Sequence, residues 1–284
     1  MTLHADNSPP LIPFARLIDQ RRISRAGDGS TVQVEFDVTE DWAQGRTAFG
    51  GLTSAFGLQA MRDLQPGATG PFVLRALQTS FVGPVTVGSV TADVVLLRQG
   101  RNVRQLQATL HQHGEVAAVL LGVFAQARES SMRTQLLRRP EPSCAPDELP
   151  PRVRAGAAPQ FLRHFDMRWD HGPQPGSSDP GLATRIHMRM VDGDGLDDEM
   201  LTVLFADVSP TPATGQFSQR PPASSVSWAL ELRPLRDPTP RDGWWRADNE
   251  SLLVDDGYVN HAARIWAPSG ELAALAYQVV AIFG

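Results

Sequence analysis

A duplication constrains the fold of this 284-residue chain more than any other feature of its sequence. Residues 103–124 read VRQLQATLHQHGEVAAVLLGVF, and residues 259–280 read VNHAARIWAPSGELAALAYQVV. Each segment has a strand-like run, a Gly-Glu turn and a second apolar run that contains Ala-Ala, and the two superpose without a gap. Such internal similarity is typical of a duplicated unit whose copies pack against each other.

The first half predicts an antiparallel sheet and one central helix. Residues 31–38 alternate apolar and polar side chains, as in a half-buried strand. Residues 52–64 carry apolar side chains at helical spacing. Strand-like runs then cover residues 73–82, 88–98, 103–112 and 116–125. A short helix is also predicted over residues 14–20, led by Pro13. A strand, a helix and then a meander of strands is the order of an α+β fold.

The second half repeats this order after a connector. Residues 126–159 lose apolar periodicity and contain six prolines, which marks a linking segment. We therefore predict an N-terminal unit over 1–130, a Pro-rich connector over 131–159 and a C-terminal unit over 160–284. The second unit has a predicted helix at 200–207 and predicted strands at 184–191, 226–232, 244–254, 259–267 and 272–283.

Composition describes a globular protein and excludes several function classes. Hydrophobic residues make up 42% of the chain and charged residues 20%, with a net charge of -5. Scattered basic residues in an acidic chain argue against nucleic-acid binding. No apolar run approaches membrane-spanning length, and the first residues do not have the pattern of a signal peptide. A single cysteine, Cys144, favours the reducing cytoplasm.

Ordered motifs in both halves carry a resemblance to a known family. In the first half they are Gln44-Gly45-Arg46-Thr47 before Phe49-Gly50-Gly51, then Phe81-Val82-Gly83-Pro84-Val85 with Gly88, then Leu97-Arg98-Gln99-Gly100-Arg101. In the second half they are Leu204-Phe205-Ala206-Asp207, Leu232-Arg233-Pro234 and the run over 272–278. Together they resemble the double-hotdog, type II acyl-CoA thioesterases. The resemblance implies two tandem hotdog units, each with a long antiparallel sheet wrapped around a central helix.

The resemblance also implies a catalytic set in the second half. The family aspartate falls on Asp207, the family glutamine on Gln278, and the family threonine on Ser224 or, less securely, on Ser225. By resemblance these side chains hold and polarise a water that attacks a thioester carbonyl, with Asp207 as the base. The alternatives are that Asp207 caps a helix and that Gln278 bonds only to backbone.

Substrate-binding candidates lie in the first half. Phe49, Gly50 and Gly51 precede the central helix, where glycines allow close backbone approach and free N–H groups favour developing negative charge. A tight strand-to-helix turn explains the same glycines without a substrate. Arg98 and Arg101 flank a hairpin glycine, where they either meet the phosphates of coenzyme A or form a solvated basic turn.

Hydrolysis of acyl-CoA is the function that the resemblance implies, with no cofactor and no metal. The acidic loop over 192–199 departs from the calcium-loop pattern, and His111 with His113 lacks a third ligand. The first half has no acid at the equivalent helix position, so we expect one site per chain. A hotdog protein that binds acyl thioesters without cleaving them is the alternative. A hydratase ranks last, because the central helix has no histidine.

Two architectural predictions complete the expectations. The in-phase duplication predicts that the sheets of the two units join edge to edge with both helices on one side, since pairing protects exposed edge strands. By family analogy, we also expect a homodimer of double hotdogs.

Overall fold

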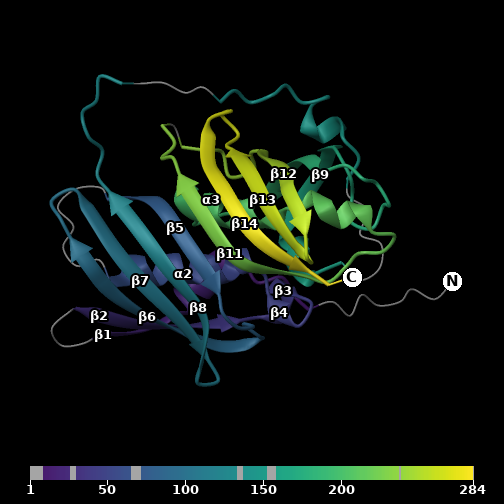
Figure 1. Ribbon diagram of the computed structural model, residues 1–284. Coiled ribbons are helices and arrows are strands. Elements are labelled where there is room, and N and C mark those ends of the chain that lie inside the picture. Colours follow the sequence, from purple (N-terminus) through teal and green to yellow (C-terminus); the bar gives the residue numbers. More distant parts are fainter. Residues whose placement is uncertain are drawn as a thin grey trace.

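One antiparallel sheet of twelve strands dominates the fold. The computed structural model describes residues 9–25, 30–64, 72–132, 137–151, 158–236 and 238–283. The sheet order is β1-β2-β6-β7-β8-β5-β11-β14-β13-β12-β10-β9, and Figure 1 shows its two halves as one curved surface. The first half contributes β1 (Arg22–Arg25), β2 (Thr31–Val38), β5 (Val73–Phe81), β6 (Gly88–Gln99), β7 (Val103–Gln112) and β8 (Glu115–Ala125). The second contributes β9 (Phe165–His171), β10 (Ala183–Met190), β11 (Ala223–Leu232), β12 (Trp245–Asp255), β13 (Tyr258–Trp266) and β14 (Leu272–Ile282).

The two halves join where β5 pairs with β11. This ladder is antiparallel and runs from the pair Ser80 and Ser227 to the pair Ala76 and Glu231. The prediction of an edge-to-edge junction is therefore confirmed. The junction leaves only β1 and β9 at the edges of the sheet.

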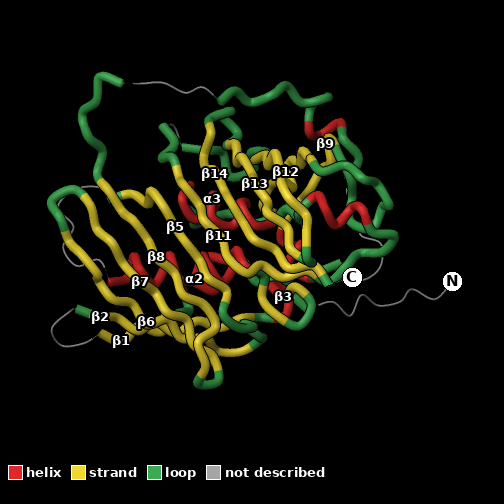
Figure 2. The backbone as a smooth tube through the Cα atoms, in the orientation of Figure 1, coloured by secondary structure: helices red, strands yellow, loops and turns green. Residues whose placement is uncertain are grey.

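The central helices lie together on one side of the sheet, as predicted. They are α2 (Gly50–Leu64) and α3 (Asp198–Val208), and they pack against each other. Figure 2 shows both behind the strands. Helix α2 is buried along most of its length, which explains its nearly uncharged sequence. Helix α3 begins two residues earlier than predicted, because the Asp197 side chain caps it by accepting from the Met200 N–H at 2.9 Å.

The two helices run antiparallel. Gly51, at the start of α2, lies beside Asp207, near the end of α3. At the opposite end of the pair, Arg62 of α2 forms ion pairs with Asp197 and Glu199 at the start of α3. The orientation places the first turn of one half's helix against the last turn of the other half's helix.

A continuous hydrophobic core links the halves. Phe49 of the first half stacks on Phe161 of the second at 4.4 Å between ring centroids, and within the second half Phe205 stacks on Trp245 at 5.2 Å. Phe165 contacts both Phe49 and Phe205 edge-on. Such contacts make the two units one packed body, because neither could expose these rings to water without a large cost.

A buried hydrogen bond between a histidine and an aspartate also spans the boundary. His164 Nε2 lies 2.9 Å from Asp41 Oδ2, and its ring stacks on Trp42 at 3.8 Å. The same Asp41 oxygen accepts from the Ile12 N–H at 2.6 Å. Asp41 and His164 are 1% and 4% exposed. This contact fixes the short helices η1 (Glu40–Trp42) and η3 (Gln160–His164) to each other.

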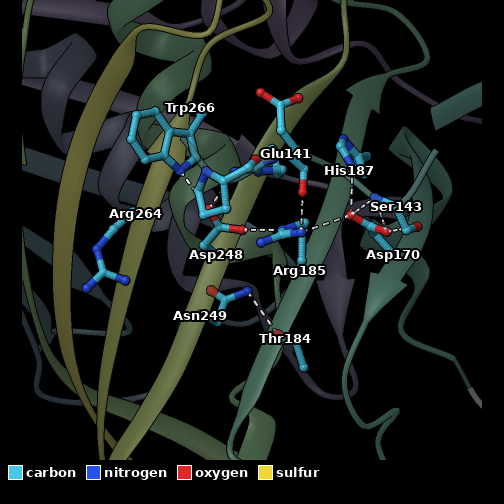
Figure 3. A network of polar contacts seen from close by, with 12 residues as sticks. Glu141, Ser143, Asp170, Thr184, Arg185, His187, Asp248, Asn249, Arg264 and Trp266 are labelled. Carbon is cyan, nitrogen blue, oxygen red and sulfur yellow. Dashed lines mark hydrogen bonds and ion pairs between the residues drawn. The ribbon is translucent and has the colours of Figure 1, made fainter. Parts of the chain in front are cut away.

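The Pro-rich connector crosses the outer face of the second half. Arg185 of β10 donates to Glu141 O at 2.8 Å, and Asp170 of β9 accepts from the Ser143 hydroxyl. Figure 3 shows Arg185 between Asp170 and Asp248. Arg185 forms an ion pair with Asp248 at 3.0 Å. The segment is thus held by charged side chains of the sheet, while the boundaries at 130 and 159 stay predictions.

The predicted strands and helices lie within three residues of their observed ends, with two strands of the large sheet, β1 and β9, missed along with the two-residue strands β3 (Ala43–Gln44) and β4 (Thr47–Ala48). β1 is entirely exposed, so its sequence carries no burial pattern. β9 lies in a segment of mixed polar and aromatic residues, FDMRWDH, whose polar members bind the connector and neighbouring strands. The short elements α1 (Phe14–Asp19), η2 (Pro146–Glu148) and η4 (Pro212–Gln216) complete the described structure.

Candidate active site

A cavity of about 890 Å³ lies between the two halves. In the first half its lining comes from the start of α2 and the end of β5. In the second half it comes from the end of α3, the start of β11 and two residues of β14, Gln278 and Val280. Gly50, Asp207, Ser225 and Gln278 all line it. The size falls within the range of small-molecule sites.

Asp207 lies where the antiparallel helices bring the two halves together. Its Oδ2 accepts from the Gly51 N–H at 2.7 Å, and its Oδ1 accepts from Gln278 Nε2 at 2.9 Å. The first contact satisfies one of the unpaired N–H groups at the start of α2. The carboxylate is therefore held by one donor from each half of the chain.

The surroundings of Asp207 raise its pKa to about 6. Burial is the dominant cause, because it removes water from the ionised carboxylate. The hydrogen bonds from Gln278 and the Gly51 N–H act in the opposite direction and limit the rise. A carboxylate with such a pKa is a stronger base than a solvated one and is still mostly ionised at neutral pH.

Gln278 joins Asp207 to a serine hydroxyl. Its Nε2 donates to Asp207 Oδ1 and also to Ser225 Oγ, at 2.7 Å. An amide nitrogen has two hydrogens, so these contacts use both. The Ser225 hydroxyl hydrogen is then free to donate elsewhere, because the oxygen acts here as an acceptor. The alternative, that Gln278 bonds only to backbone, is wrong.

The serine at this position is Ser225, whereas the sequence favoured Ser224. A bulge in β11 explains the difference: Ser225 pairs with Val280 and Ser227 pairs with Val279, so β11 holds one extra residue. Counting back in twos from the buried Trp228, which pairs with Gln278, would place Ser224 and not Ser225 on the face of Gln278. Among the described residues, no hydrogen bond joins Ser224 to Asp207 or Gln278, although Ser224 lines the cavity.

The paired glycines at the start of α2 permit this close approach. A Cβ on Gly50 would lie 2.8 Å from Asp207 Oδ2 and 2.9 Å from the Phe81 ring. A Cβ on Gly51 would lie 2.3 Å from the Phe49 ring. The Gly51 N–H is already used by Asp207, whereas none of the described residues accepts from the N–H of Gly50. Gly50 is consequently the first-turn donor that remains open to the cavity.

Three of the predicted substrate-binding residues lie away from this cavity. Phe49 is fully buried between Trp42 and Phe161, so it packs the core and does not face a ligand. Arg98 and Arg101 lie at the β6–β7 hairpin, while the cavity adjoins the opposite end of β6. The ten-residue separation of Gly88 and Arg98 along an extended strand spans roughly 33 Å. Neither arginine lines the cavity of its own chain.

The equivalent position in the first half has no comparable polar set. The duplication aligns Gln278 with Gly122, where Met61 Sδ occupies the space, 2.5 Å from where a Cβ would lie. Leu74 takes the place of Ser225, because Leu74 pairs with Phe124 and Ser225 pairs with Val280, which the duplication aligns with Phe124. Leu74 is buried, and its N–H donates to Glu199 Oε1 at 2.7 Å. Packing and ion pairs therefore replace the polar set at this end of the helices.

Thr53 and Arg220 are cavity residues that were not predicted from the sequence. Thr53 lies one turn along α2, and Arg220 precedes Pro221-Pro222 in the loop before β11. Thr53 follows the paired glycines at helical spacing, so its position could have been found. The loop of Arg220 has no periodicity from which to place a side chain.

Models of the acyl-CoA thioesterase family match both halves of the chain. The model of the acyl-CoA thioesterase N-terminal domain matches residues 38–125, and that of the C-terminal domain matches residues 141–282. The chain belongs to the acyl-CoA thioesterase family. Its fold is accordingly the predicted double hotdog, and the chain is a thioester hydrolase.

Solved structures agree with this fold. A hotdog protein from Alicyclobacillus acidocaldarius has a TM-score of 0.80 and 22% identity, over 95% of this chain and 98% of that one. The tesB protein of Mycobacterium avium subsp. paratuberculosis has a TM-score of 0.75, and the acyl-CoA thioesterase II TesB2 of Mycobacterium marinum has 0.70. Each of these two is 16% identical, over 95% of this chain and 98% of its own. At such identities the likeness shows the fold alone. No curated protein sequence matches the chain.

The described residues contain neither a cluster of metal-ligating side chains nor a membrane-spanning helix. No group of three or more His, Cys, Asp or Glu side chains there could hold a metal ion. No helix in the described part of the chain is long and apolar enough to cross a membrane.

Proposed function

We propose that the enzyme hydrolyses acyl-CoA thioesters to the free acid and coenzyme A, with a water activated at Asp207. The observation that carries the proposal is the linked set of Asp207, Gln278 and Ser225 in a cavity at the start of α2. This set offers a carboxylate base of raised pKa, a free hydroxyl hydrogen and an open backbone donor. These are the groups that hydrolysis of a thioester by water requires.

Each group has one role in the proposed reaction. Asp207 removes a proton from the water as the water oxygen attacks the thioester carbonyl carbon. The Gly50 N–H donates to the carbonyl oxygen as negative charge develops there. Gln278 orients Asp207 and Ser225, and the Ser225 hydroxyl helps to position the water. The carbon–sulfur bond then breaks, and the proton on Asp207 passes to the leaving sulfur.

The proposal is tested with Asp207→Asn, which removes the base without changing side-chain size. We expect turnover of a series of acyl-CoAs to fall by about a hundred- to ten-thousand-fold. Binding of acyl-CoA, followed by calorimetry, should stay nearly intact. Asp194→Asn is the matched control, since Asp194 is an exposed carboxylate in the loop before α3.

Two outcomes would change the proposal. Undiminished turnover by the Asp207→Asn variant would place the base elsewhere. A wild-type protein that binds acyl-CoA but hydrolyses none of the series would support the alternative, a hotdog protein that binds acyl thioesters without cleaving them. The assay separates the two, because binding is measured independently.

We propose also that two copies associate into a homodimer through the outer face of the sheet. Leu121 of β8 and Tyr277 of β14 lie on that face, 40% and 53% exposed. Light scattering at micromolar concentration should give about twice the chain mass, and a mass near 30.9 kDa would count against the dimer. A cytoplasmic location stays a prediction from the single cysteine.

A further inference from the structure

The cavity has one positively charged side chain among its described lining residues. Asp207 and Arg220 are the charged residues in that lining. Asp207 lies at the helix ends, while Arg220 belongs to the loop that leads into β11 and is exposed to solvent. The cavity thus offers a carboxylate and a separate guanidinium.

Arg220 is carried by a loop that a second loop holds in place. Residues 173–179 and 212–222 run side by side and share three backbone hydrogen bonds: Gly176 N to Thr214 O at 3.0 Å, Ser178 N to Phe217 O at 3.0 Å and Asp179 N to Gly215 O at 2.9 Å. Gly176 has a φ of +79°, and a Cβ there would lie 2.9 Å from Arg220 N. Pro221 and Pro222 stiffen the chain directly after Arg220. Its backbone is therefore fixed before any ligand arrives.

The charge of Arg220 is not neutralised within the described part of the chain. No carboxylate there forms an ion pair with it, unlike Arg62, Arg185 or Arg246, each of which contacts an aspartate. Neighbouring protein atoms displace part of the water around the exposed Arg220 side chain, which lowers its pKa, and no neighbouring negative charge opposes that effect. An unpaired guanidinium beside a cavity gains more from an anionic ligand than a fully solvated one does.

We propose that Arg220 binds a phosphate of the thiol carrier and makes the enzyme selective for phosphorylated thioesters. The inference rests on the proposed function and adds a specificity-determining residue to it. A guanidinium suits this role because its planar fork donates two parallel hydrogen bonds to phosphate oxygens. The acyl group then lies toward Asp207. The phosphate belongs either to coenzyme A or to the phosphopantetheine arm of a carrier protein.

The test compares thioesters that share one acyl chain and differ in their phosphates. They are acyl-CoA, acyl-dephospho-CoA, acyl-phosphopantetheine and acyl-pantetheine. For Arg220→Ala we expect kcat/KM with acyl-CoA to fall about ten- to a hundredfold, mainly through KM, because one charge-assisted contact is lost. With acyl-pantetheine, which has no phosphate, the same variant should match the wild type. Arg220→Lys should recover part of the loss, since lysine retains the charge without the fork.

The matched control is Arg128→Ala, an exposed arginine after β8 that does not line the cavity. It should leave kcat/KM unchanged with every thioester. Calorimetry with free coenzyme A supplies a readout besides activity, and Arg220→Ala should weaken that binding by a similar factor. Dependence on Arg220 that persists with acyl-phosphopantetheine assigns the contact to the phosphate of the arm, which both carriers share. If Arg220→Ala has no effect with acyl-phosphopantetheine but lowers kcat/KM with acyl-dephospho-CoA, Arg220 contacts the diphosphate. If the variant lowers kcat/KM only with acyl-CoA, Arg220 contacts the ribose phosphate.

Two results would overturn the proposal. If Arg220→Ala lowers kcat/KM equally with acyl-CoA and with acyl-pantetheine, Arg220 stabilises the loop and does not bind phosphate. An unchanged kcat/KM with acyl-CoA would mean that it has no role in binding. The proposed function is judged separately, by whether the wild type cleaves acyl-pantetheine and the Asp207→Asn variant does not.

Discussion

The raised pKa of Asp207 makes the pH dependence of hydrolysis a direct test of the site. The base works only when ionised, so kcat/KM should rise with pH and level off above a pKa of about 6. Below that value it should fall about tenfold for each pH unit. At neutral pH roughly nine-tenths of Asp207 is ionised, so the rate there should lie close to the plateau.

Substrate and site variants should move this profile in defined directions. A bound acyl chain removes more water from Asp207, so the pKa seen in kcat should be higher than that seen in kcat/KM. Gln278→Leu removes a hydrogen bond that lowers the pKa of Asp207. Its profile should therefore shift to higher pH as well as lose rate. The Asp207→Asn variant should keep only a small residual rate, and its kcat/KM should no longer fall as the pH drops below about 6.

The assay follows release of the free thiol at saturating and at low acyl-CoA, from about one unit below to about two units above the expected pKa. Circular dichroism across the same range confirms that the fold persists. A flat profile for the wild type would refute the assignment of Asp207 as the base. An acid limb that survives in Asp207→Asn would show that another group titrates.

Three further predictions follow from the site and its supports. Ser225→Ala should lower kcat about three- to tenfold through one lost hydrogen bond, and Ser224→Ala should leave kcat unchanged. The reverse result would mean that Ser224, and not Ser225, bonds to Gln278. Gly50→Ala should lower kcat/KM by about a hundredfold, because its Cβ displaces the base, whereas Gly193→Ala has room and should not; equal rates would contradict the close approach. Arg246→Ala should cost about 1–3 kcal/mol in urea unfolding, because Asp248 and the Pro140 carbonyl each lose a buried charged donor while Asp248 keeps Arg185, and an unchanged stability would refute this.

The sequence predicts the architecture well because its signals are local and periodic. The alternation in β2 maps directly onto its burial, with Val32, Val34, Phe36 and Val38 all facing the core. The duplication then predicts how the halves relate, since two copies that each leave an edge strand can protect it by pairing. These inferences need only side-chain spacing and a count of strands.

The site is less predictable because it depends on contacts across the chain. One inserted residue in β11 moves Ser225 to the face of Gln278, and the segment Ser224–Ser225–Val226 carries no sign of a bulge. Phe49 shows a second cause: an aromatic residue beside two glycines is equally suited to a ligand or to the core. Only the stacking on Phe161, more than a hundred residues away, decides between them.

The duplication also explains why a chain with two similar halves needs both for one site. Asp207 of the second half is held by the Gly51 N–H of the first, so neither unit alone contains the whole arrangement. At the other end of the helix pair, Glu199 contacts Arg62 and the Leu74 N–H across the same boundary. The two ends have opposite demands, because a base must keep a raised pKa while a structural carboxylate is best paired with a cation. In the proposed function, divergence after duplication lets one end serve the reaction and the other stabilise the pair of helices.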